Sequence, residues 1–378
     1  MKKTISLLLI LAAIFTMFAA CGTPAKAPEQ DTQPSQEVSS DAPAGTRTIT
    51  DALGRQVEIP TDVKRIVPLG NTPRMVTYLG IASMVVGIGE CEKADSPIKA
   101  YAYVSQDVWT GLPNVGTDAM GETAYYPEAI IEAAPDVILC TYAMDVTEDI
   151  AKQTGIPVVS VSQGTLFGED YAQSLRILGE VCGVSGRAEE LISFIDGCLK
   201  DLTERTADVS SDKKPTVLGA AATFKGSHGI EGVYSNYPVF KVLAANDVAA
   251  GISDTTGGLL VDKEKIIQWN PDMIFLDFSG TELVKTDYAA NPQFYAQLKA
   301  VKNGQVYMWP NSTWHWSNVE MPLVSAYYTG KLLYPDKFED VDFAAKASEI
   351  FGFFLGDPNY LSVLEAAGAG YGKVVLGE

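Results

Sequence analysis

Large aromatic and polar side chains occupy several loop positions of this chain, and their types suggest ligand binding. Three large rings stand in a row at Trp314, His315 and Trp316, within the polar segment STWHWSNVE. Exposed rings of this kind suit a flat or conjugated ligand. Further candidates lie in other expected loops: Asn71, Arg74, Tyr101, Trp109, Tyr142, Phe224, Lys225, His228 and Trp309. We predict a ligand-binding site built from these residues, although local loop packing would explain any single ring.

The same chain is poor in groups that catalyse reactions. Its only histidines are His228 and His315, and it has neither a Gly-x-Ser-x-Gly elbow nor a Gly-x-x-x-x-Gly-Lys-Ser/Thr loop. Gly87 and Gly89 follow an expected strand, but Glu92 stands where the dinucleotide fingerprint requires its third glycine. The loops also bring too few histidines and carboxylates together for a bare transition metal. We therefore predict a binding protein with no catalytic residue, no metal site of its own and no cofactor, whose ligand carries its own metal.

A long amphipathic helix is predicted at Arg187 to Arg205, near the middle of the chain, in the sequence RAEELISFIDGCLKDLTER. Its apolar residues recur every three or four positions and so lie on one face, with charged residues on the other. At ~1.5 Å per residue such a helix is ~28 Å long. We interpret it as a rigid strut between two lobes.

Two segments on either side of this helix resemble each other. EAIIEAAPDVIL begins at Glu128 and EKIIQWNPDMIF begins at Glu264, so Glu, Ile, Ile, Pro, Asp and Ile recur at the same spacing. Each segment has the pattern of a short helix that Pro-Asp ends and a buried strand follows. The repeat predicts two α/β lobes of one design.

Strands that alternate with helices are typical of Rossmann-like lobes with mainly parallel sheets. The expected organisation is a first lobe at 47–168, a helical linker at 169–207 and a second lobe at 208–378. More specific expectations are a strand at 84–89, a helix at 294–300, and two last helices, 319–333 and 343–354, that cover the second sheet. Because ligands of open α/β sheets bind at the carboxyl ends of strands, the site is expected in a cleft between the lobes.

The N-terminus has the pattern of a secretory lipoprotein signal. Lys2 and Lys3 precede an apolar run, and small residues lead to Cys21. This pattern predicts a signal peptide at 1–20, lipidation of Cys21, and a protein anchored to the outer side of the cell membrane. Residues 21–46, rich in Pro, Ser and Gln, are expected to form a disordered tether. Cleavage beside an incidental cysteine is an alternative, whereas a spanning anchor would need ~20 apolar residues, more than this run supplies.

The charge and the cysteines exclude other classes of protein. A formal net charge of −19 argues against a nucleic-acid partner, because phosphate backbones bind basic surfaces. After Cys21 the cysteines stand at 91, 140, 182 and 198, with no Cys-x-x-Cys pair for zinc or redox chemistry. Cys182 and Cys198 are expected to be too far apart to bridge. The redox state of Cys91 and Cys140 stays open.

From about Arg47 to Phe354 the chain resembles the substrate-binding lipoproteins of ABC importers for iron-siderophores, haem or cobalamin, the class with a long helix between two lobes. The residues that carry the resemblance are TITDALGRQVEIP, Asn114-Val-Gly-Thr, the two repeated segments, the strut helix, and LKAVKNGQVYMW. The resemblance implies a monomer that captures a metal chelate outside the membrane and delivers it to an ABC permease dimer with its ATPase.

The resemblance leaves the kind of chelate open. A strongly anionic catecholate siderophore would call for several arginines, and the loops offer few cations beyond Arg74 and Lys225. Haem with His228 or His315 as an axial ligand, or a corrinoid held between tryptophans, is the alternative. A surface enzyme that processes a metal chelate on the same fold is a further hypothesis, against which the scarcity of histidine counts.

The two repeated glutamates have two possible roles. Glu128 and Glu264 each open a short helix, where a carboxylate interacts favourably with the positive end of the helix dipole, worth ~0.3–1 kcal/mol. The family resemblance implies a second role, in which each glutamate meets arginines on one permease subunit and so fixes the docking orientation.

Overall fold

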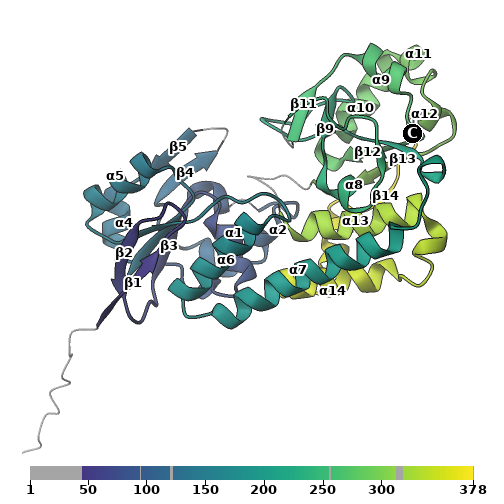
Figure 1. The fold of residues 1–378 in the computed structure, drawn as a ribbon. Helices are drawn as coiled ribbons and strands as arrows, with labels where there is room; N and C mark the ends of the chain where they lie inside the picture. The colour runs from purple at the N-terminus through teal and green to yellow at the C-terminus, as the bar shows by residue number, and fades with distance from the viewer. Residues whose placement is uncertain (1–44, 94, 120–121, 255–256, 312–317, 378) are drawn as a thin grey trace, which may run out of the picture. The chain divides into compact units, whose positions relative to one another are not determined.

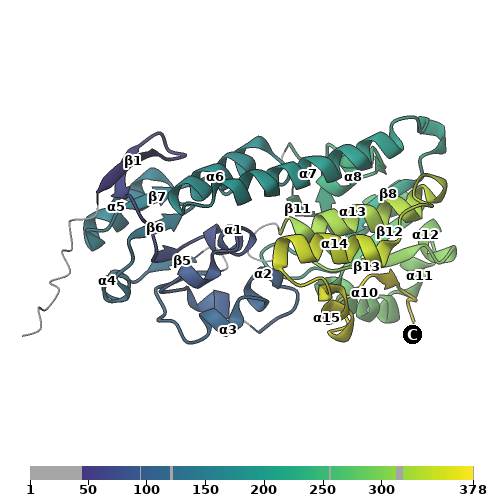
Figure 2. The same cartoon turned by 90° about the horizontal axis from the view of Figure 1, so that it is seen from below.

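The computed structural model describes residues 45–93, 95–119, 122–254, 257–311 and 318–377. Cys21 and the cluster of Trp314, His315 and Trp316 lie outside the described residues. Every described residue belongs to one compact unit, Ala44–Glu378. Within this unit the chain forms two separate sheets with parallel central strands, together with helices that pack against them (Figures 1 and 2).

The first sheet has three parallel strands in the order β3-β6-β7, preceded and flanked by two hairpins. Its strands are buried along their whole length, as runs of apolar residues covered on both faces should be. The bounds are β3 (Ile66–Pro68), β6 (Val137–Cys140) and β7 (Val158–Ser160), with hairpins β1 (Thr46–Thr50)/β2 (Gln56–Pro60) and β4 (Gly116–Ala119)/β5 (Glu122–Tyr125).

The predicted strand at 84–89 is wrong in its extent. The structure has only isolated bridges there, Ile66 to Val85 and Ile88 to Asn114. Tight 3-10 turns at Ala82–Met84 and Glu90–Lys93 close in from both sides, so too few consecutive extended residues remain for a ladder.

The second sheet is mixed, with the order β11-β9-β8-β12-β13-β14 and β10 beside β8. β8, β12 and β13 are parallel, whereas β9, β11 and β14 pair antiparallel with their neighbours. The bounds are β8 (Thr216–Ala220), β9 (Gly232–Ser235), β10 (Asn246–Asp247), β11 (Gly257–Leu260), β12 (Met273–Asp277), β13 (Val306–Trp309) and β14 (Gly372–Lys373). β12 is the buried strand that the second repeated segment predicts, whereas the short antiparallel edge strands carry no comparable sequence signal.

The two repeated segments fold alike. The first forms α4 (Pro127–Ala133) and then β6, and the second forms α9 (Lys263–Trp269) and then β12. Each helix ends at a residue in the left-handed conformation, Ala134 with φ 48° and Asn270 with φ 44°. This ending turns the chain sharply back into the sheet.

The aspartate of each Pro-Asp pair aligns the following strand with its neighbour. Asp136 accepts the backbone N–H of Arg65 at 2.8 Å, at the start of β3. Asp272 accepts both the N–H and the hydroxyl of Thr216 at 2.8 Å, at the start of β8. The repeated Pro-Asp therefore fixes strand register as well as ending a helix.

The predicted strut is helix α7 (Ser185–Thr206), 22 residues long, which begins two residues earlier than the sequence suggested. Its buried residues form the expected stripe: Ala188, Leu191, Ile192, Ile195, Cys198, Leu202 and Thr206. Helix α6 (Glu169–Val181) packs along it, as Figure 2 shows.

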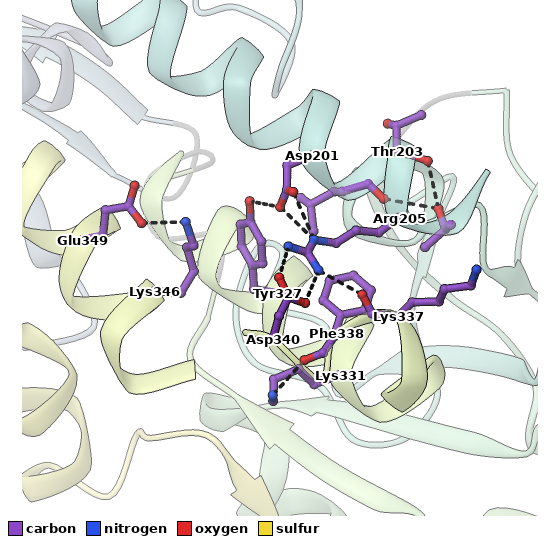
Figure 3. Close-up of polar contacts among 12 residues, drawn as sticks. Asp201, Thr203, Arg205, Tyr327, Lys331, Lys337, Phe338, Asp340, Lys346 and Glu349 are labelled. Carbon is purple, nitrogen blue, oxygen red and sulfur yellow. Dashed lines mark hydrogen bonds and ion pairs between the residues drawn. The ribbon is translucent and has the colours of Figure 1, made fainter. Parts of the chain in front are cut away.

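A polar cluster fixes the end of α7 to the C-terminal helices (Figure 3). The guanidinium of Arg205 pairs with Asp201 at 3.0 Å and with Asp340 at 2.6 Å, and it lies over the ring of Phe338. The hydroxyl of Tyr327 donates to Asp201 at 2.8 Å. These contacts keep the C-terminal end of α7 from moving relative to the C-terminal helices.

The C-terminal helices, which we predict to cover the second sheet, contact helices of both lobes. α13 (Glu320–Leu333) contacts α8 (Pro238–Val242) and α7, whereas α14 (Phe343–Leu355) contacts α1 (Thr72–Tyr78) of the first lobe. The rings of Phe354 and Tyr78 meet edge to face with centroids 5.1 Å apart. The hydroxyl of Tyr360 in α15 (Tyr360–Ala366) donates to the Pro97 carbonyl at 2.5 Å. Apolar packing therefore joins the two lobes directly.

The predicted helix at 294–300 is two short helices, α11 (Pro292–Tyr295) and α12 (Lys299–Lys302), because Leu298 has an extended backbone with ψ 123°. The remaining elements are α2 (Ala100–Tyr103), α3 (Gln106–Trp109), α5 (Met144–Thr154), α10 (Phe278–Ala290) and 3-10 turns at Ser211–Lys213 and Pro335–Lys337.

We predict only a small closure of the lobes on ligand binding. One continuous hydrophobic core includes residues of α1, α6, α7, α8 and α14, so a large hinge motion would expose buried apolar surface. Small-angle scattering of free and ligand-saturated protein should give nearly the same radius of gyration. A large decrease on loading would contradict the prediction.

Candidate functional site

The carboxyl edge of the first sheet carries a buried amide that has no hydrogen-bond partner in the described part of the chain. Asn71 stands between β3 and α1, and its side chain is 2% exposed. Neither its Nδ2 nor its Oδ1 has a hydrogen-bond partner within the described residues. A buried polar group left in this state costs about 1–3 kcal/mol. Asn71 is therefore well suited to bind a polar group of a ligand.

Arg74 lies one turn further along α1 and is the only arginine classed as buried in the described part of the chain, at 2% exposure. Its Nε donates to Oδ1 of Asn318 at 3.0 Å, and its guanidinium lies 5.1 Å from the ring centroid of Tyr101. Since arginine stays charged when buried, this position favours an anionic, oxygen-rich group.

Three residues at the start of α13 link this position to the second lobe. The hydroxyl of Tyr78 donates to Oε2 of Glu320, and the N–H of Val319 donates to that hydroxyl at 3.3 Å. Nδ2 of Asn318 and Oε1 of Glu320 are buried without partners among the described residues. The candidates predicted from the sequence do not include these residues, although Asn318 and Glu320 stand two and four positions after Trp316.

Burial raises the pKa of Glu320 to about 7, which predicts a pH dependence of stability. Between the ordinary value of 4.5 and about 7 the folded chain binds a proton that the unfolded chain has lost. The free energy of unfolding therefore falls as the pH rises through this window, by at most about 3 kcal/mol.

Glu320→Gln removes this titration. Denaturant unfolding of both proteins from about pH 5 to about pH 8 should show that the free energy of unfolding falls less with pH in the variant than in the parent protein. Burial also raises the pKa of Asp247 and Asp277 to about 6, but both groups are present in both proteins, so the difference between the curves isolates Glu320. Parallel curves of unfolding free energy against pH for the two proteins would contradict the prediction.

Tyr142 follows the end of β6 by two residues and lies beside Gly70, where a Cβ would stand 3.2 Å from its ring. It lines a small cavity of about 10 Å³ together with Gly70, Pro73, Cys91, Glu92 and Thr117. Gly70 has φ 63°, and a Cβ there would stand 2.4 Å from Oγ1 of Thr141, so the close approach of these two loops requires glycine. The structure thus brings Tyr142 next to Gly70, which precedes Asn71 in the chain, with Arg74 on α1 and Tyr101 on α2.

The loop beneath Tyr101 contains a buried ion pair. Nζ of Lys99 lies 3.0 Å from Glu92, with side-chain exposures of 1% and 3%, and it donates to the Cys91 carbonyl at 2.7 Å. Glu92, which stands at the position where the dinucleotide pattern requires its third glycine, therefore forms a structural ion pair with Lys99. Cys91 and Cys140 are free cysteines, as are Cys182 and Cys198.

Trp109 and Trp309 lie in the hydrophobic core, each with 0% exposure. Nε1 of Trp109 donates to the Ala82 carbonyl at 3.3 Å, and Nε1 of Trp309 donates to Asp277 at 2.8 Å. Both indoles therefore have packing partners, and neither lies on a surface where it could stack on a ligand. Trp109 stands in helix α3 and not in the loop that the sequence predicts.

Polar side chains tie together the carboxyl edge of the second sheet. The amide of Asn311 donates to Thr223 at 2.7 Å and to Ser279 at 2.8 Å. Asp277 accepts the N–H of Thr223 at 3.0 Å and the hydroxyl of Tyr234 at 2.6 Å. The loop after β8 is thus fixed to β12 and β13. None of these side chains is among the candidates predicted from the sequence.

Phe224, Lys225 and His228 share the loop after β8. The rings of Phe224 and His228 are stacked with centroids 4.1 Å apart, and Nε2 of His228 is 2.8 Å from the Phe224 carbonyl. Lys225 is exposed and has φ 49°. Phe224 also packs on Gly258, where a Cβ would stand 2.1 Å from the ring. An axial metal bond from Nε2 would require His228 to leave its carbonyl partner.

Glu128 and Glu264 stand in the first turns of α4 and α9, and both are exposed. Within the described residues neither carboxylate takes part in an ion pair or a side-chain hydrogen bond. Because each helix runs back to the amino end of β6 or β12, its first turn lies near the carboxyl edge of that sheet. Both glutamates are therefore available to a partner on the ligand side of their lobes.

The described residues contain no group of three His, Cys, Asp or Glu side chains arranged to hold a metal ion. The same residues include no helix with the length and apolarity that a bilayer span requires.

The periplasmic binding protein family model matches residues 76–313. The uncharacterized ABC transporter substrate-binding lipoprotein YvrC of Bacillus subtilis is 27% identical over 79% of this chain and 87% of its own length. The molybdate-binding protein MolA of Haemophilus influenzae is 26% identical over 82% and 90%, respectively. The probable siderophore-binding lipoprotein YfiY of Bacillus subtilis is 29% identical over 55% and 58%.

Solved structures of other proteins have a fold similar to that of this chain. A periplasmic solute-binding protein from Veillonella parvula superposes with a TM-score of 0.65 at 22% identity, covering 82% of this chain and 93% of that one. MolA bound to molybdate gives a TM-score of 0.63 at 22% identity, with coverages of 82% and 98%. The architecture of two α/β lobes joined by a long helix is thus a known one.

Proposed function

The chain belongs to the periplasmic binding protein family, and we propose that it captures a ferric siderophore-type chelate outside the membrane and delivers it to an ABC permease with its ATPase. Substrate-binding proteins of ABC transporters, rather than enzymes, are its relatives. The name of the relative YfiY supports the siderophore assignment. The ligand supplies its own metal, and the protein supplies the groups that recognise the chelator.

The observation that carries this proposal is the group of hydrogen-bond donors at Asn71, Arg74 and Asn318. One buried guanidinium and two amides whose donors have no partner among the described residues suit the oxygens of a chelate of low charge, such as a hydroxamate or carboxylate complex. A triscatecholate would call for more cations than Arg74 and the exposed Lys225 provide at the described strand edges. Trp314 and Trp316 remain predicted stacking partners for the chelate.

An oxyanion and a haem or corrinoid are the alternative ligands. The similarity to MolA favours an oxyanion, which the same donors would also bind. Haem or a corrinoid fits the predicted tryptophan pair, but Nε2 of His228 is engaged with a carbonyl, which weighs against His228 as an axial ligand.

A ligand panel separates these candidates. Purified protein is titrated with ferric desferrioxamine B, a ferric triscatecholate, haemin, cyanocobalamin and molybdate, and binding is followed by calorimetry. We expect a Kd of about 1 µM or lower, equivalent to about −8 kcal/mol, for the ferric hydroxamate. Tight binding of molybdate or haemin with none of the hydroxamate would refute the siderophore assignment.

Lipid anchoring through Cys21 is part of the proposal. Cys21→Ala should release the protein from membranes without change in ligand affinity, because the tether separates the anchor from the lobes. Membrane and soluble fractions of the expressing host are compared by immunoblot. Retention of the intact variant in the membrane fraction would refute anchoring at this residue.

A further inference from the structure

A buried tyrosine lies at the start of the linker between the lobes. Tyr171 stands in the first turn of α6 and is 4% exposed. Its hydroxyl has no hydrogen-bond partner among the described residues. Because burial of a hydroxyl without a hydrogen bond is unfavourable, a native protein that keeps such a group has a reason for it. The ligand-binding candidates predicted from the sequence do not include Tyr171.

The topology places Tyr171 on the ligand side of the first lobe. β7 ends at Ser160, and the loop 161–168 leads from the carboxyl end of this strand to α6. Because β3, β6 and β7 are parallel, the chain leaves β7 at the same edge at which it leaves β3. The first turn of α6 therefore follows the sheet edge that carries Asn71 and Arg74.

The loop before α6 holds the ring of Tyr171 in place. Gly164 has φ 79°, and a Cβ at this position would stand 2.7 Å from Cδ2 of the ring, so only glycine lets the loop fold so closely over it. The hydroxyl of Ser174 donates to the Ser162 carbonyl at 2.9 Å, which fastens the same loop to α6. The ring therefore has little freedom to turn its hydroxyl toward solvent.

The Tyr171 hydroxyl lies near the charged groups of the candidate site. Burial raises the pKa of this hydroxyl, the Arg74 guanidinium lowers it, and the Glu320 carboxylate raises it further. Nδ2 of Asn318 and Oε1 of Glu320 also have no partner among the described residues, whereas the hydroxyl of Tyr78 already donates to Oε2 of Glu320. Unpaired polar atoms from the linker and the second lobe thus surround one buried cation of the first lobe.

We propose that Tyr171 is a cargo-binding residue, whose hydroxyl donates a hydrogen bond to a cargo oxygen next to the oxygen that Arg74 binds. The linker between the lobes then contributes to the site directly, and its role is not confined to joining them. The cargo that fits presents a pair of adjacent oxygen acceptors to a hydroxyl and a guanidinium, as a hydroxamate, a carboxylate or an inorganic oxyanion does. This inference rests on the proposed capture of an oxygen-rich cargo and adds a donor to that site.

Tyr171→Phe tests the inference because it removes the hydroxyl and keeps the ring. Ferric desferrioxamine B and molybdate are each titrated into the parent protein and the variant by calorimetry. We expect the variant to bind the probe that the parent binds about tenfold more weakly, since one hydrogen bond to a ligand oxygen is lost. Without cargo, the urea midpoint of the variant should be no lower than that of the parent, because the hydroxyl has no partner to lose.

Tyr334→Phe is the matched control. Tyr334 is 5% exposed, and its hydroxyl also has no partner among the described residues. It follows the last residue of α13, ~21 Å of helix away from Glu320. This variant should likewise keep the urea midpoint of the parent, but it should bind the probe within about twofold of the parent.

An unchanged affinity of folded Tyr171→Phe for the probe that the parent binds would overturn the inference. A lower urea midpoint of the ligand-free variant would overturn it as well, because the hydroxyl would then have a partner within the protein. Weaker binding of molybdate, with no binding of the ferric hydroxamate by either protein, would uphold Tyr171 and refute only the siderophore assignment. A parent protein that binds neither probe would refute the oxygen-rich cargo, and the inference with it.

Discussion

Cellular uptake of the cargo is expected to stop when Glu128→Ala and Glu264→Ala are combined in one chain, while the purified variant keeps its affinity for the cargo. Both carboxylates are exposed and take no part in an ion pair within the described residues, so the fold does not depend on them. Their loss at the helix starts should cost only about 0.3–1 kcal/mol each in stability. Across a docking surface, by contrast, loss of a paired charge costs about 2–5 kcal/mol. Uptake of radiolabelled iron, supplied as ferric desferrioxamine B, measures the effect in cells.

The matched control is Glu132→Ala with Glu282→Ala, which removes the same number of charges. Glu132 is exposed one turn further along α4, and Glu282 is exposed in α10, where it pairs with Lys285. This control should take up iron normally. Normal uptake by the Glu128 and Glu264 variant would show that the repeated glutamates only begin their helices.

Arg74→Ala should lower the affinity for the cargo about 30- to 150-fold, equivalent to about 2–3 kcal/mol. The guanidinium is buried at the carboxyl edge of the first sheet, between Asn318 and Tyr101, where a charged hydrogen bond to a ligand oxygen is strong. Calorimetry with the best ligand of the panel measures the loss. Arg74→Lys should restore part of the affinity, because lysine keeps the charge but not the planar fork of donors.

Arg65→Ala is the control for this variant. Arg65 precedes the same strand, β3, at its amino edge, where its guanidinium donates to the carbonyls of Ala133 and Ala134. The Arg65→Ala variant should be less stable than the parent protein but should bind the cargo with the same affinity. Equal affinities of Arg74→Ala and the parent protein, with both folded, would remove Arg74 from the site.

The repeat and the strut were predictable because both depend on local pattern. The apolar stripe of α7 is visible from its spacing alone, and the Pro-Asp of each repeated segment carries its own end signal. The family and the fold followed from the same segments. The extent of the sheets was less predictable, since β9, β11 and β14 are short edge strands that acquire their conformation from pairing.

The polar contacts between distant segments could not be predicted from the sequence. Arg74 meets Asn318, and Tyr78 meets Glu320, across more than 240 positions of the chain. The network around Asn311 likewise joins three strand ends that only the sheet brings together. Residue type alone could not separate a ligand-facing tryptophan from a core one, so Trp309 was predicted in the site although it packs in the core.

Purification of the protein from its native host, with no ligand added, tests the central claim most directly. Absorbance, metal analysis and mass spectrometry of the released ligand identify the cargo in one preparation. The proposed function predicts a ferric charge-transfer band, iron in an amount equal to the protein, and an organic chelator of low charge. A haem Soret band, cobalt with corrinoid absorbance, or molybdenum without a chelator would contradict it.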